Sequence, residues 1–578
     1  MREFVQYLNT LHRLNGSNIN TTAEAGLKNK YAASILYKDE ELTSQIAEKL
    51  LNNGKVLLTG FAGDGKTTLA KLVADQLAGY DVDFSSSIIR FTSSEKKYVI
   101  IKDLSEISDN DASELLYNEL NNKDKSILIV SNTGSIRTKL LTAFDNGYWK
   151  DSFNSSRADF ESLVLKGIEC GENQYTGMIS IGDVVVHTFN LVKHDNLHSA
   201  KIVLKKILDS EEWDKADDAE KESVVYLNVQ LMKDNNYLAV ERMFYIYRKM
   251  YEYGIRLTMR NLLEHFSYII TGNRSDYDRS YANYLFFDNF FGVFDSNASE
   301  IEAIKCLRRF NFGDDIPGNW KRRICCGVDA ERLRINIPAA IATIDRYKGL
   351  FLEDAYLNCY YSLEDQGSII RSVFFLNNSN DIEFKKYISA FVGSPAFWYF
   401  GEIQESRGAI SRPTINKLNR ILKRVLRDFC SGLKMPTDET ETGDSIYITM
   451  ARKSKQVDQS TQIVLGEFLW NRNTVGIATI KDSRGIYQYI IKMKNSSIED
   501  NRLIINLPLM DYLSYIDAGL PLEDVDSVFQ KRLENIKLVL LNASANVEDD
   551  TISVVYKDIH NRVHPIRYVI DNKKIYVE

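Results

Sequence analysis

The chain has 578 residues, of which 44% are hydrophobic and 26% are charged, and its formal net charge at pH 7 is −7. This length predicts three or four domains, and this composition is typical of a globular protein. The acidic balance excludes a protein that binds polyanions over its whole surface, so any contact with nucleic acid has to be local. No window approaches the roughly 18 uninterrupted apolar residues of a membrane-spanning helix, and the first residues lack the apolar core of a signal peptide, so we expect a cytoplasmic protein with no membrane partner.

In chain order, the first distinctive element lies at residues 57–77, where an apolar run gives way to glycines, a lysine, two threonines and a helical pattern. The motif G-x-x-x-x-G-K-[ST] is matched at every defined position by Gly60, Gly65, Lys66 and Thr67. In this motif the glycines turn backbone N–H groups toward phosphate oxygens, the lysine reaches the β- and γ-phosphates, and the threonine hydroxyl binds Mg²⁺.

A strand pattern at residues 55–59 precedes this motif, and the apolar residues after it fall on one helical face, so a bound anion would lie at a helix N-terminus. The sequence therefore predicts a phosphate-binding loop, or P-loop, for ATP and Mg²⁺. The alternative is a glycine turn that has a lysine beside it by chance. We expect the nucleotide to contact Gly60, Gly63, Asp64, Gly65, Lys66, Thr67 and Thr68.

An apolar strand pattern at residues 98–102 is followed by two acids that are candidates for the metal and the catalytic base. We expect Asp103 to hold Mg²⁺ through water, together with the Thr67 hydroxyl. Glu106 is the candidate for the base or the water-orienting residue, although its spacing from Asp103 departs from the usual adjacent pair. For both acids the alternative is a solvated strand end.

The next strand pattern, at residues 126–131, ends at Asn132. An amide at the tip of the strand beside the Asp103 strand matches sensor 1 of AAA+ ATPases and can hold the attacking water near the γ-phosphate. The alternative is turn formation with the two residues after it. With a further strand at residues 183–189, the alternation of strands and helices predicts an α/β fold with a doubly wound, mostly parallel sheet, whose ligands bind at the carboxyl ends of the strands.

Beyond residue 200 apolar residues recur at spacings of three and four, which predicts a helical lid. Thr258 is a candidate N-cap there, and Arg260 lies in the first turn of the helix that follows. This position resembles sensor 2 of AAA+ proteins, from which Arg260 can touch the γ-phosphate and report hydrolysis to the lid. The alternative is an arginine paired at the surface. Arg137 is a weaker candidate for an arginine finger that acts in trans.

Residues 412–430 combine an apolar stripe with a basic face that consists of Lys417, Arg420, Arg424 and Arg427. Such a helix can contact a phosphate backbone, whereas a solvated face or an acidic protein partner is the commoner outcome. A linker-like composition at residues 434–445 is followed by β-rich runs that two helical patterns interrupt, which predicts a C-terminal α+β interaction domain.

These patterns divide the chain into four parts. They are a P-loop ATPase core with an N-terminal helical segment at 1–200, a helical lid at 201–330, a helical middle region with the basic amphipathic helix at 331–433, and a C-terminal α+β interaction domain at 446–578.

Resemblance to the DptF-type ATPases of DNA-phosphorothioation-dependent restriction is carried, in this order, by the segments GFAGDGKTT, IIKDLSE, ILIVSNTG and LTMRNLLEHFSYIITG. A later segment, INLPLMDYLSYIDAGLP, resembles the closing region of that family. The resemblance spreads over roughly the whole chain, and its first segment is the one that is specific by itself. It implies an AAA+-like ATPase subunit of a prokaryotic anti-phage system, which works with partner subunits on DNA that lacks a protective backbone modification. By position, the match covers residues 60–67, Asp103, Asn132 and Arg260.

The resulting hypothesis is an ATPase that couples ATP binding and hydrolysis to partner subunits in bacterial DNA restriction or anti-phage defence. Its catalytic set is Lys66, Asp103, Glu106, Asn132 and Arg260. Two alternatives stay open, namely a STAND-like signalling switch and a structural nucleotide clamp that does not hydrolyse ATP. We find no nuclease constellation, so we expect a partner to carry any DNA cleavage. Contact with DNA, direct or through partners, and assembly into a homo-oligomer are left open.

Overall fold

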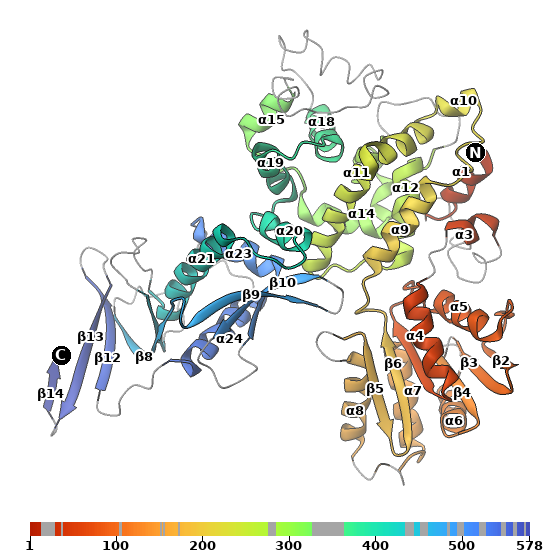
Figure 1. Ribbon diagram of the computed structural model, residues 1–578, viewed down its shortest axis with the longest axis horizontal. Coiled ribbons are helices and arrows are strands. Elements are labelled where there is room, and N and C mark those ends of the chain that lie inside the picture. The colour runs from red at the N-terminus through yellow and green to blue at the C-terminus, as the bar shows by residue number, and fades with distance from the viewer. Residues whose placement is uncertain are drawn as a thin grey trace. The chain divides into compact units, whose positions relative to one another are not determined.

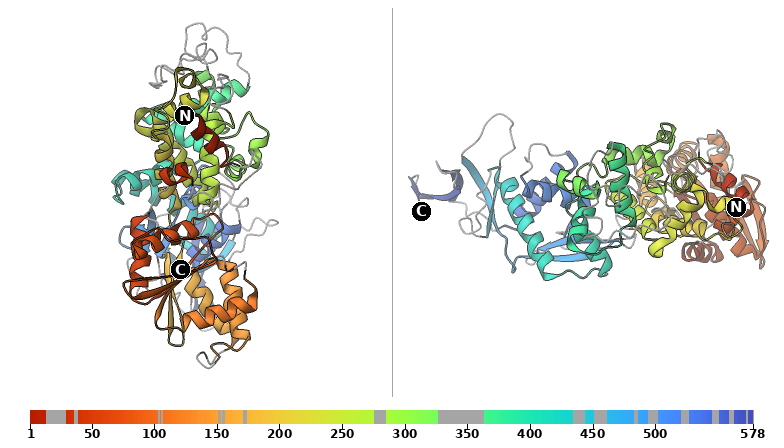
Figure 2. Two further views of the ribbon diagram at one scale, coloured as in Figure 1. Left: turned by 90° about the vertical axis from the view of Figure 1, so that its right-hand side faces the viewer. Right: turned by 90° about the horizontal axis from the view of Figure 1, so that it is seen from above.

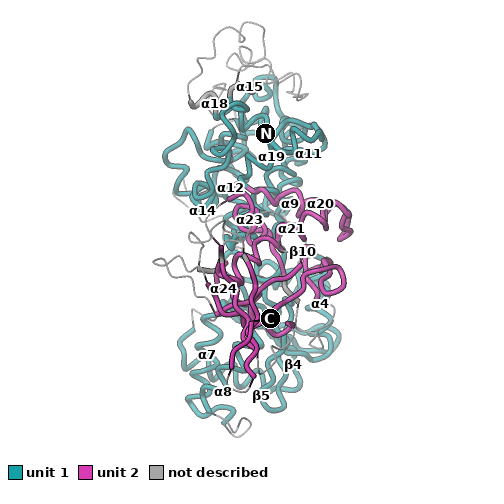
Figure 3. Tube along the Cα trace, turned by 90° about the vertical axis from the view of Figure 1, so that its left-hand side faces the viewer, with its two compact units in different colours: residues 1–393 teal, residues 394–578 magenta. Residues whose placement is uncertain are grey.

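The computed structural model describes residues 1–12, 29–35, 39–102, 104, 107–150, 153, 156–170, 174–274, 285–325, 363–433, 444–450, 461–482, 486–493, 502–519, 527–544, 551–558, 563–571 and 574–577. The chain falls into two compact units, Met1–Gly393 and Ser394–Glu578, which Figure 3 draws in different colours. No helix in the described ranges combines the length and the apolar character needed to cross a membrane.

The first unit is built around a six-stranded sheet of β1 (Lys55–Gly60), β2 (Ile88–Ser93), β3 (Lys96–Ile101), β4 (Lys125–Asn132), β5 (Thr176–Ile181) and β6 (Val184–Asn190) (Figure 1). The strand order is β2-β3-β4-β1-β6-β5. The four inner strands are parallel, whereas β2 and β5 pair antiparallel at the edges. The α/β sheet predicted from the sequence is confirmed, and the four predicted strands correspond to β1, β3, β4 and β6. The two antiparallel edge strands were not predicted.

Helices cover both faces of this sheet. Val56 and Leu58 of β1 pack with α4 (Glu40–Leu51) and α5 (Lys66–Ala78), whereas Leu57 packs on the opposite face with α6 (Asp109–Leu120), α7 (Thr133–Asp145) and α8 (Arg157–Glu169). The two helical layers lie on opposite sides of the strands in the left view of Figure 2. A strand that is covered on both faces is apolar throughout, which leaves its ends as the places for polar groups.

The carboxyl ends of three neighbouring strands lie in line. Gly60, the last residue of β1, pairs with Asn132, the last residue of β4. On the other side of β1, Thr59 pairs with Asn190, the last residue of β6. Because ligands of parallel sheets bind at the carboxyl ends of the strands, this edge is where a site is expected.

In the first unit, the described elements outside this α/β part are helices, and most of them lie beyond residue 200, where the sequence predicts helices. Its helices are α1 (Arg2–Asn9), α3 (Lys30–Ile35), α9 (Asn196–Leu208), α10 (Asp218–Lys221), α11 (Val224–Glu252), α12 (Met259–Thr271), α13 (Phe286–Asn289), α14 (Glu302–Leu307), α15 (Gly318–Cys325), α18 (Leu363–Leu376) and α19 (Ile382–Val392), with short 3₁₀ turns at Asn297–Glu300 and Arg308–Phe310. Non-helical backbone at residues 234–237 divides α11 into two helical segments.

Buried polar contacts position α12, the helix that carries Arg260. A capping box joins Thr258 and Asn261 at its N-terminus. On its buried face, His265 Nδ1 lies 2.7 Å from the Tyr247 hydroxyl and Nε2 lies 2.9 Å from the Phe290 carbonyl. Because a carbonyl can only accept, Nε2 carries the proton and Nδ1 accepts from the tyrosine. Burial lowers the pKa of His265 to about 3, so the ring is neutral at pH 7 and both hydrogen bonds persist.

The second unit combines helices with two antiparallel sheets. One sheet has the order β11-β10-β9 and the other the order β14-β13-β12-β8-β7. Its elements are α20 (Phe397–Glu405), α21 (Arg412–Ser431), β7 (Ser445–Thr449), β8 (Thr461–Leu469), β9 (Val475–Lys481), β10 (Tyr487–Met493), β11 (Arg502–Ile505), α23 (Leu507–Asp517), α24 (Ser527–Asn542), β12 (Thr551–Lys557), β13 (Val563–Asp571) and β14 (Lys574–Val577). The predicted α+β character of the C-terminal region is confirmed. Residues 434–443 of the predicted linker lie outside the described residues.

The predicted basic helix is α21, and its apolar stripe packs in the core of the second unit. Its basic face is smaller than the helical spacing suggested. Arg424 pairs with Asp517 at 3.1 Å, and Arg427 is buried with 5% of its surface exposed. Of the four basic residues that define the predicted face, Lys417 and Arg420 are the two that remain exposed. The reason is that α21 packs between β7, α23 and α24, which cover more than one side of the helix.

Candidate functional site

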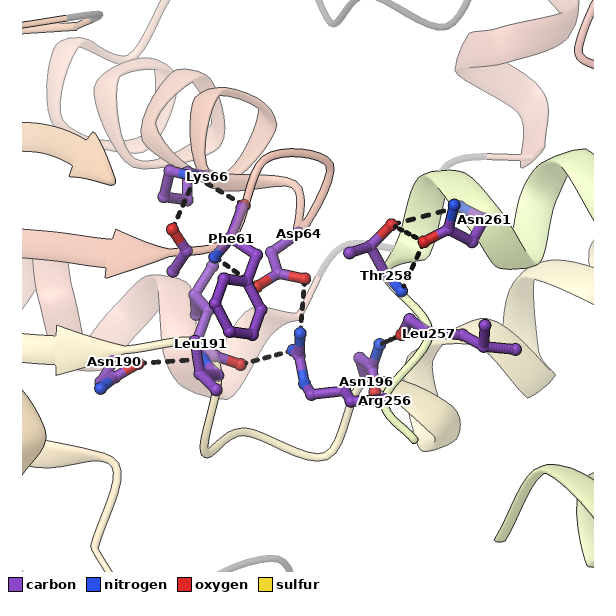
Figure 4. A network of polar contacts seen from close by, with 12 residues as sticks. Phe61, Asp64, Lys66, Asn190, Leu191, Asn196, Arg256, Leu257, Thr258 and Asn261 are labelled. Carbon is purple, nitrogen blue, oxygen red and sulfur yellow. Dashed lines mark hydrogen bonds and ion pairs between the residues drawn. The ribbon is translucent and has the colours of Figure 1, made fainter. Parts of the chain in front are cut away.

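The glycine-rich loop, residues 60–67, joins the buried strand β1 to the first turn of α5 (Figure 4). Gly63 and Gly65 have φ angles of +89° and +84°, which residues with a Cβ rarely adopt. Gly65 is the N-cap of α5, so the chain passes directly from the loop into a helix of 13 residues. The first N–H groups of such a helix have no partner within it, and they carry the positive end of its dipole.

The Lys66 ammonium group is held at the end of the sheet. Its Nζ donates to the carbonyl oxygen of Phe61 at 2.7 Å, to that of Gly60 at 3.2 Å and to Oδ1 of Asn132 at 2.8 Å. The residue is 9% exposed. These three acceptors are neutral oxygens, and the contacts fix the position of the ammonium group at the point where the loop meets α5.

Asn132 reaches Lys66 because of the sheet register. It is the last residue of β4 and the N-cap of α7, and β4 pairs with β1 so that Asn132 stands opposite Gly60. Its side chain makes no capping hydrogen bond within α7, and its oxygen accepts from Lys66 instead. Beside it, the hydroxyls of Thr59 and Thr133 lie 3.0 Å apart and connect β1 to the start of α7.

The Asp64 carboxylate is turned back onto the loop and is buried in an ion pair (Figure 4). Its Oδ2 accepts from the backbone N–H of Phe61 at 2.9 Å, and its Oδ1 lies 2.7 Å from Nη1 of Arg256. The second terminal nitrogen of Arg256 donates to the carbonyl of Leu191 at 2.8 Å. The side chains of Asp64 and Arg256 are 1% and 10% exposed. Asp64 was predicted as a nucleotide contact, but in the structure it is paired with a residue from the helical region.

The N-terminus of α12 contacts the same loop through its backbone. The N–H of Arg260 donates to the carbonyl of Gly63 at 3.1 Å. A Cβ on Gly63 would lie 3.0 Å from the Cβ of Arg260 and 3.1 Å from Oγ1 of Thr258. The predicted sensor helix therefore does reach the glycine-rich loop. The side chain of Arg260 is exposed, and no described residue pairs with it.

Two glycine substitutions are expected to separate backbone strain from this contact. Gly63→Ala and Gly65→Ala each place a Cβ at a positive φ, which costs about 1–2 kcal/mol. At Gly65 the new Cβ meets no atom within 4 Å, whereas at Gly63 it presses on α12. We therefore expect Gly63→Ala to lower the free energy of unfolding by about 1 kcal/mol more than Gly65→Ala, measured by urea denaturation. Equal losses would show that α12 does not rest on the loop.

Four other residues were predicted to contact the nucleotide or the metal, or to act as the catalytic base. Thr67 and Thr68 are half-buried in the first turn of α5. Asp103 and Glu106 come after β3, the strand beside β4, but both lie outside the described residues. Their assigned roles therefore stay predictions.

The structure gives partners within the chain to two further arginines, Arg137 and Arg256. Arg137, the candidate finger, forms an ion pair with Glu161 of the same chain, with Nε 3.0 Å from the carboxylate. Arg256 was not singled out at all. The available signal was Asp64, an acid inside a phosphate-binding motif that calls for a neutralising cation. Which cation supplies that charge depends on tertiary contacts between segments far apart in the sequence.

In the described part of the chain, no group of three or more His, Cys, Asp or Glu side chains is arranged to hold a metal ion. Comparison of the chain with models of protein families, with curated proteins and with solved structures found no match. Its function has to be argued from the residues of the site itself.

Proposed function

We propose that this chain is an AAA+-like P-loop ATPase, which binds ATP with Mg²⁺ at the glycine-rich loop and hydrolyses it. The proposal is carried by the contact of Lys66 with Gly60 and Asn132. This contact lies at the carboxyl ends of two neighbouring parallel strands and at the N-terminus of α5. An ammonium group, a helix N-terminus and the end of a parallel sheet each favour phosphate binding, and here the three coincide.

The residues of the loop fit a triphosphate and its metal ion. A Cβ on Gly65 would meet no atom within 4 Å, so phosphate oxygens have room to approach the backbone there. Thr67, in the first turn of α5, offers a hydroxyl of the kind that binds Mg²⁺ in such loops. Asp103 is the candidate for the carboxylate. When bound, ATP supplies the phosphoanhydride bond and Mg²⁺ supplies positive charge beside the phosphates.

Each residue of the chain then has a distinct role. Lys66 binds the β- and γ-phosphates, and the amide of Asn132 beside it orients the attacking water. Glu106 accepts the proton of that water. Arg260, which is exposed at the start of α12, contacts the γ-phosphate and reports its loss to the helical region.

The biological setting of this ATPase is inferred from the resemblance to DptF-type proteins. In this proposal the chain is a cytoplasmic subunit of a bacterial restriction or anti-phage system, and its ATP cycle drives partner subunits. The exposed Lys417 and Arg420 of α21 are its candidate residues for a direct phosphate contact with DNA. A homo-oligomer is compatible with this role.

The proposal is tested with the purified chain in two steps. Calorimetric titration with ATP and Mg²⁺ should give saturable binding that adenosine does not reproduce, because the phosphates provide the contacts. Steady-state hydrolysis is then measured with and without duplex DNA. Turnover that rises with DNA supports a defence motor, and ATP-dependent growth of the particle mass in light scattering would favour the signalling switch. Binding without turnover under any condition would favour the clamp, and no binding at all would refute the proposal.

A further inference from the structure

Asp64 presents an electrostatic problem for the site proposed above. It is the one acid in the sequence of the glycine-rich loop, and it stands directly before Gly65 and Lys66. Its side chain is 1% exposed, so water does not screen its charge effectively. A buried carboxylate in a loop that receives a polyanion would repel that ligand unless its charge is neutralised.

Arg256 provides the neutralising charge and also fixes the direction of the carboxylate. One terminal nitrogen of its guanidinium group holds Asp64 Oδ1 at 2.7 Å, while the other is anchored on the Leu191 carbonyl, which follows β6. The remaining Asp64 oxygen accepts from the Phe61 N–H, so the carboxylate is fixed from both sides. Arg256 Nε is buried, and no described residue accepts a hydrogen bond from it. The planar fork of arginine is needed for this bridging geometry, which a lysine cannot reproduce.

We propose that Arg256 is a positioning residue for the nucleotide: it neutralises Asp64 and holds its carboxylate against the start of the loop, so that the loop can accept a triphosphate. This inference rests on the proposed function and assigns part of that function to a residue outside the motif. The chain passes from Arg256 to Thr258 and Arg260, whose atoms contact Gly63. The affinity for ATP therefore depends on how the start of α12 is seated against the loop.

The test is the affinity for ATP with Mg²⁺, measured by calorimetry on the full chain for Arg256→Gln, Asp64→Asn and the double variant. Arg256→Gln leaves a buried negative charge beside the phosphates, so we expect affinity to fall on the order of tenfold to a hundredfold. Asp64→Asn breaks the same ion pair but removes the negative charge and leaves the positive charge of Arg256 unpaired in the loop, so affinity for the polyanion should rise. The double variant has neither charge, and its affinity should return to within about threefold of the wild type.

Opposite effects of two substitutions that break one contact distinguish this role from a purely structural one. If the ion pair only stabilised the fold, both single variants would weaken ATP binding alike, and that result would overturn the inference. Near-ultraviolet circular dichroism checks that each variant is folded. Arg248→Gln is the matched control, because it breaks the Arg248–Asp195 pair of 2.9 Å in the same unit and should leave affinity unchanged. A wild-type chain that binds no ATP would instead refute the proposed function, together with the inference that rests on it.

Discussion

Replacing Lys66 with alanine is expected to weaken ATP binding about a hundredfold and to reduce hydrolysis below detection. A hydrogen bond from a charged donor contributes about 1.5–3 kcal/mol, and each 1.4 kcal/mol corresponds to tenfold in affinity. The loss should exceed that of an ordinary surface lysine, because the ammonium group is already fixed by Phe61, Gly60 and Asn132 before any ligand arrives. Calorimetry gives the affinity, and release of inorganic phosphate gives the rate.

Lys71 provides a matched control on the same helix. It lies farther along α5, where it is buried to the same extent as Lys66 and pairs with Asp75 and Asp81. Lys71→Ala should lower the thermal stability of the chain but leave ATP affinity within about threefold of the wild type. If both lysine variants lost binding to a similar degree, the effect of Lys66 would reflect the integrity of α5 rather than a phosphate contact.

Asn132→Ala is expected to lower the rate of hydrolysis about a hundredfold while ATP affinity stays nearly unchanged. Removing one preorganised polar group from a catalytic centre costs about two to three orders of magnitude in turnover. Lys66 keeps its contacts with the Phe61 and Gly60 carbonyls in this variant, so the ammonium group that we propose as the phosphate ligand stays in place. A fall in kcat without a rise in KM indicates a group that acts in the transition state.

The control for this variant is Thr133→Val, which removes the 3.0 Å hydroxyl contact with Thr59 at the same end of the sheet. It should lower stability by about 1 kcal/mol and leave kcat unchanged. If Asn132→Ala raised KM instead of lowering kcat, its oxygen would serve to hold Lys66 in position, and the water-orienting role would be wrong.

The inner strands of the first sheet and the glycine-rich loop were predictable from the sequence, because each is marked by a pattern of a few consecutive residues. Strands β1, β3, β4 and β6 are covered on both faces, so they appear as short apolar runs. The edge strands escaped prediction: β2 and β5 are partly exposed and have mixed patterns. β8 is an inner strand of its sheet that the sequence patterns also did not mark. Its buried and exposed positions alternate, but Ile463, Leu465 and Leu469 on the exposed face are also apolar, which removes the period-two signal.

The part of the site that was missed depends on contacts between distant segments. Helical spacing correctly gave α21 an apolar stripe, but it could not show that Arg427 is buried and that Arg424 meets Asp517. In the same way, a cap and an arginine in a first turn suggested Arg260, but no local pattern pointed to the ion pair that Arg256 makes with Asp64 of the loop. A local pattern identifies which residues share a face of one element, and it carries no information on the element that covers that face.

The wide separation of the loop's contacts along the chain has a consequence for the order of folding. Strand β1 pairs with β4 and β6, which follow it in the chain, and the ion-pair partner of Asp64 is Arg256, which comes later still. While the protein is being synthesised, the glycine-rich loop therefore leaves the ribosome well before the strands beside it, and long before the arginine that neutralises it. Contacts of such high sequence separation form late. In the proposed ATPase, the first unit should thus gain the ability to bind ATP at the end of its folding, and ATP should stabilise the finished unit without accelerating its early steps.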